Sequence, residues 1–430
     1  MSILLENISI IPMTGSADFL EKGYIIIEGQ SIKEVGSGLA PVGNHELIID
    51  GTNRAVLPGF INAHTHAAMT FLRSYADDMP LMEWLETKVW PLEDKLTGED
   101  VYWGTMLAIT EMIKSGTTCF ADMYFFMDEA AQACEKSGIR AVLSRGMVGV
   151  GPSADLALSE SRELVGKWHR GANNRITMML GPHAPYTCPP DYLRKVIDLA
   201  AELGMALHIH VAETAGERED MIKTYGKSPV KHLESCGLFE RAVLAAHCVH
   251  VDEDDIAILK KYQVGVAHNP ESNMKLASGI APVPAMLAAG IPVALGTDGA
   301  SSNNNLDMLA ELRTAAFLHK VNTMDPTVLP AYQALEMATR NGAIALGLKQ
   351  ETGQLKAGMK ADMIIMNLEA PHMIPRYDIV ANIVYSGQAS DVETVIIDGR
   401  VIMQDREIIA FDEAEVLEQA KRCAAGLVSR

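Results

Sequence analysis

The 430-residue sequence lacks the cysteine patterns that stabilise small secreted domains or hold a zinc ribbon. Its six cysteines are widely scattered, and no C-x-x-C motif occurs. The motif P-C-x-x-C, which the zinc deaminases that act on nucleic-acid bases require, is likewise absent. Scattered cysteines are normal for free thiols in a reducing compartment, and the sequence therefore predicts a cytoplasmic protein.

Long apolar runs are also missing. No stretch of 18 uninterrupted apolar residues exists, so we expect no spanning helix and no membrane partner. Residues 1–10 contain no basic residue and carry Glu6 within their apolar run, which argues against a signal peptide. Aromatic residues make up only 6% of the chain, but 48% is hydrophobic and 21% charged. This composition is typical of an ordinary globular protein with a large core.

Basic residues are scarce relative to acidic ones. The chain has 36 lysines and arginines against 55 aspartates and glutamates, which gives a formal net charge of -19. Such a surface repels a phosphate backbone, so the charge balance excludes a nucleic-acid partner. A small-molecule ligand is the expected partner. The sequence does not determine the oligomeric state, and a symmetric homo-oligomer is compatible with it.

The two ends of the chain share a sequence pattern that the middle lacks. Residues 1–56 and 349–430 contain short β-branched runs closed by turn residues, and residues 412–430 have helical spacing. In residues 57–348, short apolar runs alternate with longer helical patterns, which indicates a parallel sheet. We predict a small β-sandwich domain built from both ends, with the terminal helix in its C-terminal part, around a catalytic barrel domain at 57–348.

The middle segment predicts a closed (β/α)8 TIM barrel of the α/β class. Eight strands with polar C-terminal ends are expected, and they end near His66, Asp122, Arg145, His183, His210, His247, His268 and Asp298. A doubly wound open sheet is the alternative. No G-x-G-x-x-G follows the first strand, and eight similar units favour closure.

The segment between the first strand and the helix that begins near Asp100 is unusually long. It runs for more than thirty residues and contains several large apolar side chains, including Trp84 and Trp90. In a barrel this insertion lies on the face that carries active sites. We therefore expect a lid or pocket wall, although an extra packing helix would give the same pattern.

The strand ends carry the chemistry. His64 and His66 are two residues apart in a strand, so their side chains project the same way, at a separation that one metal ion can bridge. Six of the thirteen histidines fall at predicted strand ends: 64, 66, 183, 210, 247 and 268. Structural histidines would not gather on one rim, so the pattern predicts a metal site. Spacing alone does not decide between His208 and His210 as a ligand.

The number of metal ions follows from the fourth strand. Barrels with two ions commonly bridge them with a modified lysine at the end of that strand, and residues 180–186 (LGPHAPY) contain none. We therefore expect one divalent ion per subunit. Zinc fits imidazole and carboxylate ligands best, while iron and manganese also accept them. A structural role is assigned to His169, His208, His232, His250 and His319.

Several motifs together resemble the amidohydrolase superfamily. They are PGFINAHTH, GPHAPY, HVAET, AAHCVH, HNPESNMKL and GTDGASSNNN, with GQLKAGMKAD in the C-terminal part. The resemblance covers almost the whole chain. Within the superfamily, the segments SYADDMPL and WPLE make the sequence most similar to the 5-methylthioadenosine/S-adenosylhomocysteine deaminases.

The resemblance implies a role for each matching residue. It assigns the metal to His64, His66, His210 and Asp298. It places Glu213, His247 and Asp298 around the reacting carbon, as ring-nitrogen acid, hydroxide-orienting group and proton carrier, respectively. It gives substrate contacts to Glu93, Arg145, His183 and Glu213, with Glu93 on the ribose hydroxyls. A second arginine of some family members is absent from residues 148–155, so the resemblance supports recognition of the nucleoside more strongly than recognition of a charged homocysteine tail.

The implied reaction is the metal-dependent hydrolysis of adenine nucleosides to the inosine derivative and ammonia. The rival within the superfamily is a hydrolase of 5'-deoxyadenosine or adenosine, guanine, cytosine or a triazine. The rival outside catalysis is a barrel kept only as an interaction scaffold. Metal analysis of the purified protein separates the scaffold from the enzymes.

Overall fold

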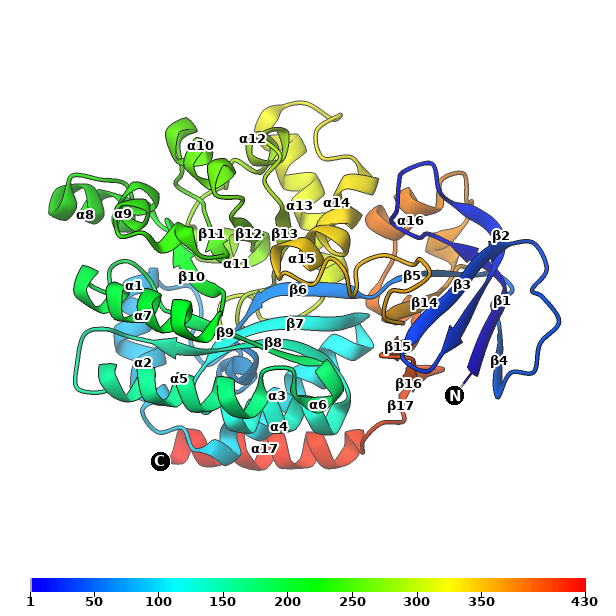
Figure 1. Ribbon diagram of the computed structural model, residues 1–430, viewed down its shortest axis with the longest axis horizontal. Helices are drawn as coiled ribbons and strands as arrows, with labels where there is room; N and C mark the ends of the chain where they lie inside the picture. The colour runs from blue at the N-terminus through cyan, green and yellow to red at the C-terminus, as the bar shows by residue number, and fades with distance from the viewer. Residues whose placement is uncertain (1) are drawn as a thin grey trace.

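A closed parallel barrel forms the centre of the computed structural model, which describes residues 2–430 (Figure 1). Its eight strands are hydrogen-bonded in chain order. They are β6 (Phe60–Thr65), β7 (Thr117–Tyr124), β8 (Arg140–Met147), β9 (Ile176–Pro182), β10 (Leu207–Val211), β11 (Val243–His247), β12 (Gly265–His268) and β13 (Val293–Leu295). Nearly every strand residue is buried, as expected for parallel strands that are covered on both faces.

The barrel closes where its last strand meets its first. The backbone N–H of Asp298 donates to the carbonyl of His64 at 2.9 Å, and the N–H of Thr297 donates to Oδ1 of Asn62 at 3.0 Å. Glycine is required at 296 because a Cβ there would lie 2.8 Å from the backbone nitrogen of His64. The predicted barrel is thus confirmed over the open sheet, and all strand C-termini share one face.

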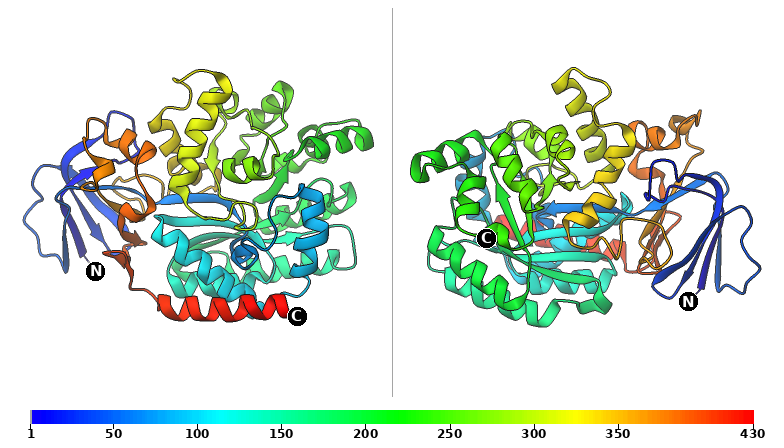
Figure 2. Two further views of the ribbon diagram at one scale, coloured as in Figure 1. Left: turned by 180° about the vertical axis from the view of Figure 1, so that it is seen from behind. Right: turned by 45° about the horizontal axis from the view of Figure 1, so that its top comes forward.

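Helices surround the barrel on its outside (Figures 1 and 2). In the barrel segment they are α3 (Gly98–Lys114), α4 (Met127–Ser137), α5 (Ala154–Trp168), α6 (Gly171–Asn174), α7 (Pro190–Leu203), α8 (Ala215–Tyr225), α9 (Pro229–Ser235), η3 (Leu238–Glu240), α10 (Glu253–Lys261), α11 (Pro270–Lys275), α12 (Val283–Ala288), α13 (Met308–Thr323), α14 (Ala331–Met337) and α15 (Arg340–Ala345). No helix within residues 2–430 is both long and apolar enough to span a membrane.

Both chain ends contribute to one further sheet of nine strands. Its strands are β1 (Ser2–Ile10), β2 (Leu20–Glu28), β3 (Ser31–Ser37), β4 (Leu47–Asp50), β5 (Arg54–Pro58), β14 (Met363–Asn367), β15 (Val392–Ile397), β16 (Arg400–Gln404) and β17 (Glu407–Ile408). The ends meet where β5 pairs antiparallel with β14. One face of this sheet buries an aliphatic cluster of its own, with isoleucines from β1, β2 and β3.

The last segments of the chain are helical. After β14 come η4 (Pro371–Met373), α16 (Ile379–Tyr385) and η5 (Ala389–Asp391), and the chain ends in α17 (Glu413–Ser429). Helix α17 lies along α3 of the barrel, at a distance from the small sheet (Figure 2). The domain boundaries at 56/57 and 348/349 stay predictions, and β5 crosses the first of them.

A buried arginine joins the barrel to the small sheet. Arg140 begins β8 at the end of the barrel opposite the active-site face and is 1% exposed. Its Nε and Nη2 donate to the two carboxylate oxygens of Asp362 at 2.6 and 3.1 Å, and Nη2 also lies 3.4 Å from Asp398. Burial alone would lower the pKa of the guanidinium, but these carboxylates outweigh burial and raise it.

The long insertion after β6 folds over the active-site face. It contains η1 (Ala67–Leu72) and a continuous helical stretch of α1 (Leu81–Trp84), the π-turn η2 (Leu85–Val89) and α2 (Trp90–Glu93). The indole N–H of Trp84 donates to the carbonyl of Ala76 at 3.0 Å, and Lys275 pairs with Asp77. We call residues 67–97 the lid.

Candidate metal centre and active-site pocket

A cavity of about 540 Å³ opens at the C-terminal ends of the barrel strands. Lid residues, among them Trp84 and Glu93, form one wall. All the sequence-predicted site residues except His64 line it: His66, Glu93, Arg145, His183, His210, Glu213, His247 and Asp298. His64 is fully buried in the cavity floor. The fold therefore brings residues from six barrel strands and the lid into one pocket.

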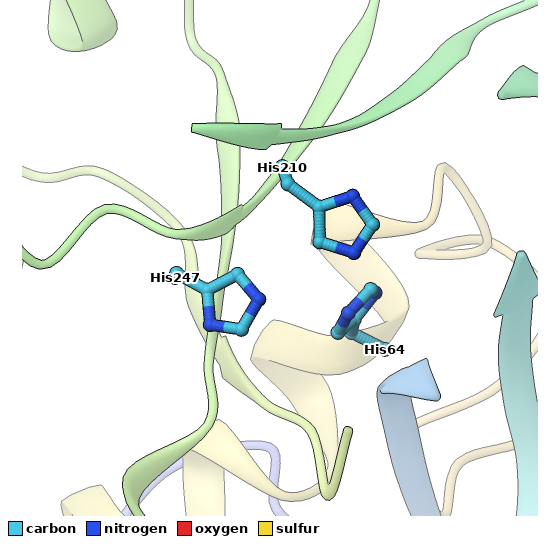
Figure 3. Close-up of side chains that lie close together, drawn as sticks. All are labelled: His64, His210 and His247. Atoms are coloured by element: carbon cyan, nitrogen blue, oxygen red, sulfur yellow. The ribbon is translucent and has the colours of Figure 1, made fainter. Parts of the chain in front are cut away.

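Imidazole nitrogens and a carboxylate converge on one point of the floor. Asp298 Oδ1 lies 3.4 Å from Nε2 of His64 and 3.3 Å from Nε2 of His66. Nε2 of His66 and Nε2 of His210 are 3.3 Å apart. His64, His66 and Asp298 form one group that could hold a metal ion, and His64, His210 and His247 form an overlapping one. Figure 3 shows the three imidazoles of the second group facing one another from β6, β10 and β11.

Backbone hydrogen bonds determine which ring nitrogen of two histidines is available. Nδ1 of His66 donates to the carbonyl of Met123 at 2.6 Å, and Nδ1 of His210 donates to the carbonyl of His183 at 2.7 Å. In their neutral forms, which carry one proton each, both rings direct an Nε2 lone pair at the other. Two lone pairs at this separation repel unless a cation lies between them. This arrangement is typical of histidine ligands, whose second nitrogen is hydrogen-bonded.

The charges around this point also indicate a cation site. Burial lowers the pKa of His66, but Asp298 beside Nε2 outweighs burial and raises it to about 9. A proton then occupies the place beside Asp298 that a metal ion would take. Burial lowers the pKa of His64 to about 4, and Nε2 of His64 has no hydrogen-bond partner. These residues fit a divalent ion held by His64, His66, His210 and Asp298.

His247 presents the opposite ring nitrogen to the pocket. Its Nδ1 accepts from the amides of Asn269 at 3.3 Å and Asn273 at 3.0 Å. Burial lowers the pKa of His247 to about 4, so the neutral ring carries its proton on Nε2. Nε2 lies 3.8 Å from Oε2 of Glu213. His247 is therefore arranged as a hydrogen-bond donor toward the pocket, and this distinguishes it from a metal ligand.

Asp298 is held by hydroxyl groups on the side away from the histidines. Its Oδ2 accepts from Ser272 at 2.7 Å and from Ser302 at 3.1 Å, and Oδ1 accepts from the backbone of Gly299. Burial alone would raise the pKa of Asp298, but the imidazoles of His64 and His66 beside its Oδ1 hold it well below its ordinary value. The carboxylate is ionised and oriented, as a metal ligand must be.

Glu213 lies next to the metal-binding point in a dry environment. It is 8% exposed, and burial, with Asp298 nearby, raises the pKa of its carboxyl to about 8. A second carboxylate, Glu217, accepts the backbone N–H groups of Ala212 and Glu213 at 2.9 and 2.8 Å. Glu217 thereby stabilises the left-handed turn at Ala212 that directs Glu213 into the pocket.

The remaining predicted contacts lie farther up the pocket. Burial raises the pKa of Glu93 to about 7, and the nearby hydroxyl of Tyr124 counteracts this effect. Nδ1 of His183 pairs with Oγ1 of Thr187 at 2.9 Å. Nε of Arg145 donates to Glu160 at 2.8 Å, and its guanidinium stacks 5.3 Å from the Phe125 ring centre. Arg145 thus enters the pocket already paired with a carboxylate.

Sequence reasoning missed four polar residues that orient the central groups. Asn269, Ser272 and Asn273 lie in the motif HNPESNMKL, and Glu217 lies four residues after Glu213. They contact His247, Asp298 and the turn at Ala212, as described above. The concentration of amides and hydroxyls in that motif was the available signal. Only the structure shows which side chains they reach.

The chain is similar to known proteins over its whole length. The model of the amidohydrolase family matches residues 55–402. A 5-methylthioadenosine/S-adenosylhomocysteine deaminase of Syntrophomonas wolfei is 69% identical over the full length of both chains. The protein of the same name from Pelotomaculum thermopropionicum is 56% identical, with 100% of this chain and 99% of the relative covered. The crystal structure of an adenosine deaminase from Xanthomonas campestris with bound zinc is 34% identical, with a TM-score of 0.95 over 100% of this chain and 99% of the other.

Proposed function

Because this chain belongs to the amidohydrolase family, and within it to the 5-methylthioadenosine/S-adenosylhomocysteine deaminases, we propose that it deaminates these two nucleosides. The products are the corresponding inosine derivative and ammonia. The observation that carries the proposal is the convergence of three imidazoles and Asp298 on one point of the pocket floor, beside the buried acid Glu213.

The cofactor of this proposal is one divalent ion per subunit, zinc, held by His64, His66, His210 and Asp298. The convergence of the three Nε2 atoms and Asp298 supports this ligand set, as does the zinc in the structure of the Xanthomonas relative. When bound, such an ion acidifies a water molecule and so supplies a nucleophile at neutral pH.

Three protein groups handle the protons of the reaction. Glu213 donates to a ring nitrogen of the purine, because its raised pKa keeps the carboxyl protonated at neutral pH. His247 orients the attacking oxygen through its Nε2–H. Asp298 takes the proton of the attacking water and passes it to the leaving amino group. The proton transfers by Glu213 and Asp298 keep charge from accumulating on the substrate during the addition.

The upper pocket holds the rest of the nucleoside. Glu93 accepts hydrogen bonds from the two ribose hydroxyls, and the lid tryptophans cover the sugar. Arg145 and His183 contact the substrate beyond the purine. Glu160 pairs with Arg145, so the arginine's charge is already balanced when an uncharged methylthio group is bound. The same pocket also accommodates a charged tail.

The proposal places this chemistry in the cytoplasm, with a small molecule as the partner and a homo-oligomer as a compatible state. All six cysteines are unpaired, which supports a reducing compartment. The acidic composition argues against a nucleic-acid partner.

A substrate panel with metal analysis tests the proposal. The zinc-loaded protein is assayed for ammonia release from methylthioadenosine, S-adenosylhomocysteine, 5'-deoxyadenosine and adenosine, with guanine, cytosine and a chlorinated triazine as controls. We expect the first two nucleosides to have the highest kcat/KM. Preferential turnover of a free base or triazine contradicts the proposal, and a protein without metal or turnover supports the scaffold alternative.

A further inference from the structure

His64 differs from the other two histidine ligands in what it contacts on its far side. His66 and His210 each donate Nδ1–H to a backbone carbonyl. Nδ1 of His64 instead lies 2.8 Å from Nε2 of His208, a side chain that can be either donor or acceptor. A carbonyl oxygen forces the ligand's tautomer, whereas an imidazole does so only if its own proton is held elsewhere.

The location of that proton follows from the next two contacts. Oγ of Ser144 lies 2.8 Å from the carbonyl oxygen of Asp122, and two oxygens this close require the hydroxyl proton between them. The oxygen of Ser144 is then the acceptor for Nδ1 of His208, which lies at 3.3 Å. His208 accordingly carries its proton on Nδ1.

The remaining assignments are forced in turn. His208 Nε2 is bare and accepts the Nδ1–H of His64, which leaves Nε2 of His64 bare toward Asp298. All three residues of this chain, Ser144, His208 and His64, are 0% exposed, so no water molecule can supply another partner.

We propose that Ser144 and His208 are positioning residues that set the tautomer of His64, so that its Nε2 lone pair is directed at the metal. This inference rests on the proposed metal site and deepens it. Neither residue touches the substrate or the ion. Their role passes entirely through His64, and the carbonyl of Asp122 is the fixed acceptor that anchors the chain.

Two substitutions at His208 separate positioning from packing. In His208→Gln, an amide oxygen near the place of imidazole Nε2 can still accept from His64. In His208→Leu, an apolar side chain fills the space but offers no acceptor, so the Nδ1–H of His64 is buried without a partner. The tautomer with the proton on Nε2 then competes with metal binding.

The first measurement is the zinc dissociation constant, obtained by competition with a chelator. Loss of groups that orient metal ligands typically weakens binding by 10–100-fold, so we expect His208→Leu to weaken zinc binding by about this factor. His208→Gln should stay within about threefold of the wild type. The second measurement is the ¹⁵N shift pattern of the His64 ring in metal-free protein, which should show a bare Nε2 in the wild type and in His208→Gln only.

Ser144→Ala provides an independent arm if His208→Leu does not fold. It should weaken zinc binding in the same direction, whereas Ser161→Ala should not. Ser161 is a matched control, because it is 2% exposed and its hydroxyl donates to the carbonyl of Ala157, away from the site.

Zinc binding at the wild-type level in both His208→Leu and Ser144→Ala overturns the inference. Equal weakening in His208→Gln and His208→Leu overturns it as well, since packing alone would then explain the loss. A wild-type protein that binds no divalent ion contradicts the proposed function itself, so the two failures are distinguishable.

Discussion

Replacing Glu213 by glutamine tests the proposed acid. Glutamine keeps the shape of the side chain and one acceptor oxygen, but it cannot deliver a proton to the purine ring. General acid catalysis contributes about 10²–10⁴-fold, so kcat of Glu213→Gln should fall by at least about 10²-fold. This loss corresponds to about 2.7 kcal/mol of transition-state stabilisation, at 1.36 kcal/mol for each factor of ten.

The structure adds a pH signature to this prediction. Burial raises the pKa of Glu213 to about 8, so the protonated form that the reaction needs is present below that pH. Activity of the wild type should therefore decline as the pH rises through about 8. Glu213→Gln has no proton to lose, and its residual activity should not show this decline.

The assay is ammonia release across a pH series, with zinc content measured on the same samples. The backbone at Glu213 is held by Glu217, so the substitution should leave the turn intact and the zinc content unchanged. Loss of zinc together with activity would identify Glu213 as a ligand and refute the role assigned to it. If the activity of Glu213→Gln declined with pH as the wild type's does, titration of Glu213 would not be the origin of the decline.

Three further substitutions test other parts of the structure. His66→Ala should abolish zinc retention and turnover while circular dichroism shows a folded barrel, and full activity without metal would contradict the proposed centre. Glu93→Ala should lower kcat/KM for ribonucleosides by a factor that corresponds to about 1.5–3 kcal/mol of transition-state stabilisation, the range for a hydrogen bond to a charged group. The substitution should matter far less for 2',3'-dideoxy analogues. Equal losses on both kinds of substrate would assign Glu93 to lid support. Arg140→Met leaves Asp362 buried and unpaired and should lower the free energy of unfolding by about 3–5 kcal/mol, measured by denaturant titration. The double variant with Asp362→Leu should recover part of that loss, and no recovery would contradict the pairing argument.

The order of strands and the face that carries the site could be predicted from local patterns. Apolar runs ending in His66, His210 and His247 indicate strands whose C-terminal residues are polar, and parallel strands put those ends on one face. The long stretch after His66 predicted a segment over that face, and the lid lies there. Neither inference needed more than side-chain period and chain connectivity.

Other features depend on contacts between distant segments, which no local pattern encodes. Spacing left His208 and His210 equivalent, because side chains two residues apart project to the same side of a strand. The terminal helix was expected in the small β domain, but it packs along α3 of the barrel.

The sequence by itself determined the barrel, the rim of histidines and the absence of a bridging lysine, since each depends on residue type and periodicity. Only the tertiary structure decided the direction of each ring nitrogen. The carbonyls of Met123 and His183, the amides beside His247 and the hydroxyl of Ser144 come from separate segments of the chain. A neutral imidazole has one proton, and its position depends on the acceptor that folding brings to either side of the ring.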